Sequence, residues 1–209
     1  MSYVLGLIFA DGTIEDVRSS SRTCYIDLSS KDKYLVEKLR YILSSKHKIY
    51  MRKPQMRNFS NGTFMSSRLF SLRIGNKMMY QDLINLGVTP RKSLTMEFPL
   101  VPRKYLHFFL RGYSDGDGCV NIYRPKDRNA PRIRVIFTSG SFNFLTVLAE
   151  ILNKYVGTER KIVLNCSGAY RLIYSKNDSL KALRFIYQNI DESPYLQRKY
   201  RKYAKFILN

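Results

Sequence analysis

The sequence predicts an α+β protein built from two pseudo-symmetric repeats, each with the order helix, two strands, helix, two strands, helix (αββαββα). A short apolar segment that ends in Asp-Gly occurs twice, as Val4–Gly12 and Leu110–Gly118. After each copy, a β-prone run and then a helix-patterned run follow in the same order. A duplication therefore explains the 209 residues better than one continuous domain does.

The elements of the first repeat follow from its pattern. A β-prone run covers Arg22–Leu28, and a helix-patterned run covers Lys31–Leu43. Asn61-Gly62 predicts a tight type I′ turn, because both positions of that turn need positive φ angles. It separates two stretches of β-branched, aromatic and polar residues, so we expect a hairpin of Ile49–Phe59 and Thr63–Ile74.

The second repeat has the same order. Its first strand is expected at Arg132–Thr138 and its second helix at Ser141–Leu152. Ser167-Gly168 predicts the matching hairpin, between Lys161–Asn165 and Ala169–Tyr174.

A proline-containing segment separates the repeats. Gly87 and Pro90 end one helix, and Pro102 suits the first turn of the next. We therefore place the first repeat at residues 1–98 and the second at 99–209, with the linker within about 87–102.

Charge indicates the class of partner. Lysine and arginine number 36 against 16 acidic residues, a net charge of +20, and the basic residues are spread from Arg18 to Lys205. We expect a polyanion that contacts most of the chain. Charge alone leaves DNA, RNA and a plain solubility charge open. No membrane partner is expected, because no apolar stretch is long enough to cross a bilayer.

Cysteine and histidine usage does not predict a zinc site. Cys24, Cys119 and Cys166 are far apart, and His47 and His107 do not cluster. We interpret the cysteines as reduced residues of an intracellular protein. The N-terminus enters a structured motif at once, with no targeting signal, so organellar, bacterial, archaeal and phage origins all remain open. No organic cofactor is expected.

Small residues recur at helical spacing in both motifs. Gly6 and Ala10, like Gly112 and Gly116, lie four residues apart and so share one face of a helix. Such faces let two helices approach closely. In the second copy an apolar stripe on another face is expected to face the core of its own half; it consists of Leu106, Phe109, Leu110 and Tyr113.

Parallel packing of these helices would bring Asp11 and Asp117 together at the C-terminal ends of both. Two carboxylates there repel each other and the helix dipoles, so the arrangement predicts a bound cation. Oxygen ligands favour Mg²⁺, with Mn²⁺ or Ca²⁺ as substitutes. A single Asp-Gly after a helix is usually an ordinary turn, but two matched copies favour a metal site. We also assign Ala10 and Gly116 to it.

Both segments resemble the LAGLIDADG motif of homing endonucleases, and Gly6–Gly12 fits it closely. The second copy departs from the pattern at Arg111 and at Tyr113-Ser114, but keeps the acid and the final glycine. The resemblance spans essentially the whole chain. It implies a monomeric saddle with a central LAGLIDADG helix pair and antiparallel DNA-binding sheets. It also implies staggered double-strand breaks in a long, asymmetric DNA target, with Asp11 and Asp117 as catalytic residues.

An Arg-Lys pair follows each motif at nearly the same distance. Lys92 lies 81 residues after Asp11, and Lys199 lies 82 residues after Asp117. A lysine near the scissile phosphate can stabilise developing negative charge or position water. We assign both lysines to the active centre, although an ordinary surface lysine is an equally good interpretation in so basic a chain.

Strand patterning predicts the DNA-binding residues. Arg132–Phe137 alternates arginine with apolar residues, which places two arginines on the outer face of a sheet. Each candidate has either a base contact, a phosphate contact or no partner. The predicted set is Arg18, Arg22, Tyr25, Arg52, Lys53, Arg57, Arg68, Arg73, Arg124, Arg128, Arg132, Arg134 and Arg171.

Alternatives remain open at this point. Relatives of this family include RNA maturases that help introns splice, and regulators that bind without cutting. Retention of Asp11 and Asp117 argues against a dead nuclease, but nothing in the pattern separates an RNA-binding face from a DNA-binding face. Intron RNA is thus a possible second partner. A basic ribosomal or chromatin protein without chemistry ranks last.

Overall fold

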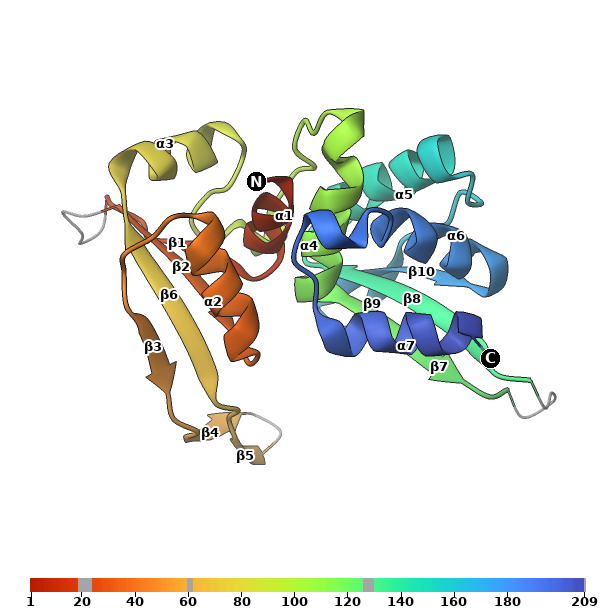
Figure 1. Ribbon diagram of the computed structural model, residues 1–209, viewed down its shortest axis with the longest axis horizontal. Coiled ribbons are helices and arrows are strands. Elements are labelled where there is room, and N and C mark those ends of the chain that lie inside the picture. The colour runs from red at the N-terminus through yellow and green to blue at the C-terminus, as the bar shows by residue number, and fades with distance from the viewer. Residues whose placement is uncertain (19–23, 60–61, 126–129, 209) are drawn as a thin grey trace.

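The computed structural model describes residues 1–18, 24–59, 62–125 and 130–208. Two helices, α1 (Ser2–Asp11) and α4 (Leu106–Asp117), pack side by side at the centre of the molecule. Figure 1 shows one half of the chain on either side of this pair, with the strands of the two halves diverging away from it. The predicted pair of repeats around a central helix pair is confirmed.

The first half has a four-stranded antiparallel sheet in the order β1-β2-β6-β3. Helices α2 and α3 pack against it. The elements after α1 are β1 (Thr13–Ile14), β2 (Tyr25–Ser30), α2 (Lys33–Ile42), β3 (Ile49–Arg52), β4 (Met56–Phe59), β5 (Gly62–Met65), β6 (Leu69–Gly75), α3 (Lys77–Asn85) and the 3-10 turn η1 (Lys92–Leu94).

The second half repeats this sheet in the order β7-β8-β10-β9. Helices α5 and α6 occupy the places of α2 and α3, and one further helix follows. The elements are the 3-10 turn η2 (Arg103–Tyr105), α4, β7 (Gly118–Tyr123), β8 (Arg132–Ser139), α5 (Phe142–Val156), β9 (Leu164–Cys166), β10 (Ala169–Ser175), α6 (Lys176–Ile186), the 3-10 turn η3 (Ile190–Glu192) and α7 (Gln197–Leu208).

The hairpin predictions hold in part. Ser167 and Gly168 both have positive φ, at 37° and 87°, as the predicted type I′ turn requires. In the first half the long strands that we predict are each broken in two: the first at Pro54, which has no N–H to continue a ladder, and the second at residues 66–68. The resulting tip hairpin of β4 and β5 pairs Phe59 with Gly62, and Asn61 lies outside the described residues.

One apolar core runs through both halves and across the helix pair. The predicted stripe on α4 is buried, but it does not face only its own half. The Phe109 ring lies edge-on to Phe9 of α1, with centroids 5.6 Å apart, whereas Tyr113 packs on Phe144 of α5. The stripe faces the seam because α1 and α4 approach closely enough for their aromatic rings to meet. The boundary placed at residues 98 and 99 stays a prediction.

No helix within the described ranges combines the length and the hydropathy that a membrane span requires.

Candidate active centre and nucleic-acid surface

The small residues of the two motifs allow the close approach of α1 and α4. A β-carbon on Gly6 would overlap the carbonyl oxygen of Phe109, and one on Gly112 would overlap the carbonyl oxygen of Tyr3. The two glycines therefore meet the facing backbone reciprocally, as expected for a pseudo-twofold pair. A larger side chain at either position would push the helices apart, because backbone atoms cannot move aside.

This packing brings the motif carboxylates to the same end of the helix pair. Asp11 and Asp117 are the last residues of α1 and α4. A β-carbon on Gly116 would lie 2.9 Å from Oδ2 of Asp11, so the carboxylate of one half rests on the last turn of the other half's helix. Ala10 lies beside Gly116 at the same level.

Two negative charges at the active centre are energetically unfavourable. Burial, followed by the charge of Asp11, raises the pKa of Asp117 to about 6. Burial also raises the pKa of Asp11, opposed by the positive charges of Lys199 and Lys92. Asp117 is therefore largely ionised near pH 7, and burial makes the anionic form of each carboxylate energetically costly.

Lys92 and Lys199 are not surface lysines, since each is only 6% exposed. Their ammonium groups stand at the ends of the motif helices, where the last carbonyls lack partners within the helix and a cation complements the dipole. Lys92 donates to the carbonyl of Gly12 at 2.6 Å. Burial lowers the pKa of Lys92, and the negative charges of Asp117 and then Asp11 oppose that shift.

Lys199 contacts more carbonyl oxygens than Lys92 does. Its Nζ lies within hydrogen-bonding distance of four carbonyl oxygens, those of Ser114 (2.7 Å), Asp115 (2.7 Å), Gly116 (3.3 Å) and Gly118 (2.5 Å). Burial lowers the pKa of Lys199 to about 8, so the ammonium form still predominates at pH 7. The catalytic assignment of both lysines stays a prediction; their placement beside both carboxylates fits it.

A buried polar group that the sequence did not predict lies behind the second motif. Asp115 Oδ2 accepts hydrogen bonds from the hydroxyl of Tyr3 (2.9 Å) and the amide of Leu196 (2.8 Å), so it joins α1 to the segment that leads into α7. Burial raises the pKa of Asp115 to about 6. The available signal was the residue type, because Phe9 occupies the matching position of the first motif.

Arg111, where the second motif departs from the expected small residue, is also fully buried. Its guanidinium donates to the carbonyl of Ile186 at 2.9 Å and contacts the carbonyls of Gln188, Asn189 and Ser193, where α6 ends. The arginine therefore neutralises orphan carbonyls at a helix terminus. The helix pair tolerates it because it points away from the seam, into its own half.

The outer face of the first sheet carries several predicted DNA-binding residues. Tyr25, Arg52 and Arg73 line a shallow cleft of about 840 Å³ over this face. The Arg73 guanidinium stacks on the Tyr25 ring at 4.1 Å and forms an ion pair with Glu15. The inward residues of the same strands, such as Ile26 and Leu72, are buried. The face opposite the core is thus polar and basic.

The outer face of the second sheet also carries arginines. Arg132 and Arg134 point outward while Ile133 and Val135 are buried, as predicted from the alternation. Arg171 joins them from β10, where it pairs with Thr138. The Arg134 guanidinium lies over the Tyr123 ring at 4.4 Å.

The other predicted DNA-binding residues lie at the edges of these two faces. Lys53, Arg57 and Arg68 are exposed around the tip hairpin, which lies at the end of β6 farthest from α1 (Figure 1). Arg18 is exposed and paired with Asp16, and Arg124 is exposed just beyond β7. Arg22 and Arg128 lie outside the described residues. Contacts of the whole set with nucleic acid stay predictions.

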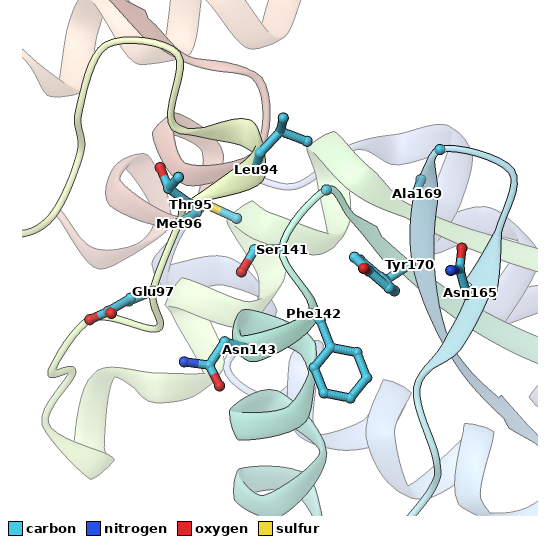
Figure 2. Close-up of a pocket in the computed structure, with 12 residues that line it drawn as sticks. Leu94, Thr95, Met96, Glu97, Ser141, Phe142, Asn143, Asn165, Ala169 and Tyr170 are labelled. Carbon is cyan, nitrogen blue, oxygen red and sulfur yellow. The ribbon is translucent and has the colours of Figure 1, made fainter.

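A separate cleft lies between residues 94–97 of the linker and the second half. Figure 2 shows Leu94 and Glu97 of the linker on one side, and Phe142, at the start of α5, with Tyr170 on the other. Its volume is about 720 Å³, and no lysine or arginine lines it. It does not suit a polyanion, so the candidate site remains the pair of motif ends flanked by the outer faces of the sheets.

Comparisons with known proteins agree with the geometry. Residues 110–208 match the family model described as LAGLIDADG endonuclease. The fold is similar to that of the I-LtrWI LAGLIDADG homing endonuclease bound to target DNA, with 15% sequence identity, a TM-score of 0.58 and coverage of 99% of this chain and 88% of that one. No curated protein matches the sequence.

Two further solved structures are similar. The LAGLIDADG meganuclease I-AabMI bound to uncleaved DNA has 12% identity and a TM-score of 0.59, over 99% of this chain and 90% of that one. The meganuclease I-SmaMI bound to uncleaveable DNA has 13% identity and a TM-score of 0.58, over 99% and 87%. At these identities the likeness establishes the fold. The resemblance predicted from the motifs is confirmed.

Proposed function

We propose that this protein is a site-specific DNA endonuclease, because residues 110–208 match the LAGLIDADG endonuclease family model and the whole chain has the fold of solved LAGLIDADG endonucleases. In finer terms, it is a homing endonuclease that acts as a monomer and makes staggered double-strand breaks in a long, asymmetric target. The observation that carries the proposal is the meeting of Asp11 and Asp117 at the seam, between two sheets with basic outer faces.

The residues at the seam fit a divalent metal. Mg²⁺ in nucleic-acid enzymes is commonly held by one or two carboxylates together with substrate phosphates and water. The motif ends offer two carboxylates, and within the described ranges no cluster of three or more His, Cys, Asp or Glu side chains exists to form an all-protein cage. Asp11 and Asp117, beside Ala10 and Gly116, would hold the ion. Bound Mg²⁺ activates water and neutralises charge on a phosphodiester.

The other side chains of the centre act through charge and position. Lys92 and Lys199 keep the ends of α1 and α4 fixed by binding their last carbonyls, which sets the separation of the two carboxylates. Their positive charges also favour the ionised carboxylates that a metal needs, since they oppose the upward pKa shift of Asp11. A phosphate placed at the seam would meet the same two cations.

The two sheets supply the means of finding a target. Arginines on outer faces neutralise phosphates and read base edges in the major groove, where each base pair has a distinct pattern of donors and acceptors. The two faces carry different side chains, so the two half-sites of the target differ. A net charge of +20 predicts strongly salt-dependent affinity, because phosphate neutralisation releases counterions.

The test is cleavage of a library of randomised duplex DNA by the purified chain with Mg²⁺. Wild type is expected to cut both strands at one long site. Asp11→Asn or Asp117→Asn should slow double-strand cleavage by at least about 10³-fold, because a metal site contributes several kcal/mol to catalysis. Affinity measured in Ca²⁺ should change only a few-fold, since these carboxylates do not contact the groove.

Asp82→Asn on the exposed side of α3 is the matched control, and it should cut as wild type does. Full cutting by Asp11→Asn or Asp117→Asn would refute the metal assignment. Specific binding by wild type without any cutting would favour a maturase or a non-cleaving regulator with this fold.

A further inference from the structure

The sheet register places one row of side chains at the same point of each half. Thr13 and Cys119 each lie two residues after the motif aspartate and point outward. In the first half the row continues from Thr13 across β2 and β6 to Asp27 and Arg73. In the second half it continues from Cys119 to the residues that pair in the same way, which are Ile136 and Ile173. These two rows are equivalent by pseudo-symmetry and opposite in chemistry.

Asp27 in the first row is an anion on a basic face. Arg73 lies directly across from it, but the Arg73 guanidinium pairs with Glu15 instead. Asp27 accepts hydrogen bonds from the hydroxyls of Ser29 (2.7 Å) and Ser71 (2.8 Å), which fix its carboxylate without neutralising it. Among the described residues no lysine or arginine forms an ion pair with it, and it lines the cleft over the outer face.

A carboxylate in this position repels phosphate, so its favourable partner on DNA is an amino group. In the major groove cytosine presents its N4 amine as a donor, whereas adenine presents its N6 amine beside the acceptor N7. The N7 lone pair disfavours an approaching carboxylate. Asp27 therefore suits cytosine better than any other base.

The second row has no hydrogen-bonding side chain of comparable strength. Ile136 and Ile173 are partly exposed on the outer face, whereas Ile133 of β8 points into the core, and Cys119 is exposed. Apolar side chains on an outer face match the C5-methyl group of thymine, which distinguishes that base in the major groove.

We propose that these two rows determine the base preference of the paired inner positions of the target: Asp27 selects cytosine in the half-site of the first repeat, and Ile136 with Ile173 selects thymine in the half-site of the second. This inference rests on the proposed function and adds which base is preferred at each inner position of the target. The asymmetry of the target then follows from one row of side chains in each half.

The test is sequencing of the DNA that the protein enriches from a library of randomised duplexes in Ca²⁺. Wild type should prefer cytosine at one inner position and thymine at its pseudo-symmetric counterpart, each by on the order of ten-fold. Asp27→Asn should change the first preference from cytosine to adenine, because an amide can bind N6 and N7 together. Asp27→Ser should abolish that preference, and Ile136→Ala should weaken only the thymine preference.

Asp82→Asn removes the same charge from α3 and should leave every position unchanged. A wild-type profile that Asp27→Asn and Asp27→Ser both leave intact would overturn the inference while the proposed function stands. Wild-type protein that enriches no sequence at all would overturn both. Thermal unfolding of each variant identifies any profile change that comes from loss of the fold.

Discussion

The ends of the two motif helices, here called the motif corners, carry the same residue types but are built differently. At the first, Lys92 belongs to the three-residue turn η1 and binds one carbonyl, that of Gly12. At the second, Lys199 belongs to the twelve-residue helix α7 and reaches four carbonyls at the end of α4. An ammonium group has three N–H donors. Among the described residues Lys199 therefore uses all of them within the protein, whereas Lys92 keeps two.

This difference separates two roles that the sequence presents as one. A lysine whose donors are all satisfied internally contributes mainly to the stability of its corner. A lysine with free donors can also bind a phosphate without breaking an internal bond. The pseudo-symmetry thus extends to the carboxylates and the helix packing, but not to the cations that support them.

Methionine substitutions at the two lysines test this difference most strongly. Lys199→Met should lower the free energy of unfolding by about 2–4 kcal/mol, because several buried carbonyls lose their donor. Lys92→Met should cost about 1 kcal/mol but should slow cleavage by on the order of 10²-fold if its free donors bind phosphate. Urea denaturation and cleavage rates measure the two effects. Equal losses of stability in both variants would remove the proposed distinction.

The carboxylates differ in a second way that pH reveals. The pKa of Asp117 is raised from 3.8 to about 6, so the folded state binds this proton more tightly than the unfolded chain between those values. The free energy of unfolding therefore falls as pH rises from about 4 to about 6, and stays lower above that range. In metal-free buffer, Asp117→Asn should stabilise the protein at pH 7.5 by about 1–2 kcal/mol.

Most of the gain should disappear near pH 4, where Asp117 is protonated in the folded state and still partly protonated in the unfolded chain. Asp11→Asn is the comparison: its pKa is also raised by burial, but Lys199, Lys92 and Arg198 oppose the shift, so a smaller gain is expected. Thermal denaturation in EDTA at the two pH values measures both variants. A gain of the same size at pH 4 and pH 7.5 would show that charge is not its cause.

The smallest expected difference lies at two equivalent helix starts. The Asn76 side chain accepts a hydrogen bond from the amide of Met79 at 2.9 Å, whereas Ser175 at the start of α6 makes no such side-chain cap. Asn76→Ala should cost about 1 kcal/mol, and Ser175→Ala close to nothing. Chemical denaturation of both variants checks this, and a larger loss at Ser175 would contradict it.

Much of the fold was readable from local pattern. The repeat order, the alternation of Arg132 and Arg134 with buried residues, and the turn at Ser167-Gly168 are all local properties, and the structure confirms them. The break at Pro54 was readable from the missing N–H but was not predicted. The shared core could not be predicted from local pattern, because the contact of Phe9 with Phe109 joins segments 100 residues apart.

The candidate site divides in the same way. The motif spacing predicted that Asp11 and Asp117 meet, because two stacked small residues on each helix leave few other ways to pack. It did not predict the burial of Arg111 and Asp115, whose partners come from the end of α6, the segment before α7 and helix α1. Nothing in the residue types indicated that a motif arginine would bind carbonyls instead of solvent.

The sequence by itself determined the two repeats, the basic surface and the position of the acidic pair, because periodicity, charge and helix-face spacing are properties of neighbouring residues. Only the tertiary structure decided which cation supports which corner and which side chains share a row across the sheets. Lys199 owes its four carbonyls to the docking of α7, and Asp27 owes its place opposite Arg73 to strand register. Both depend on contacts between segments distant in the chain, which local pattern does not encode.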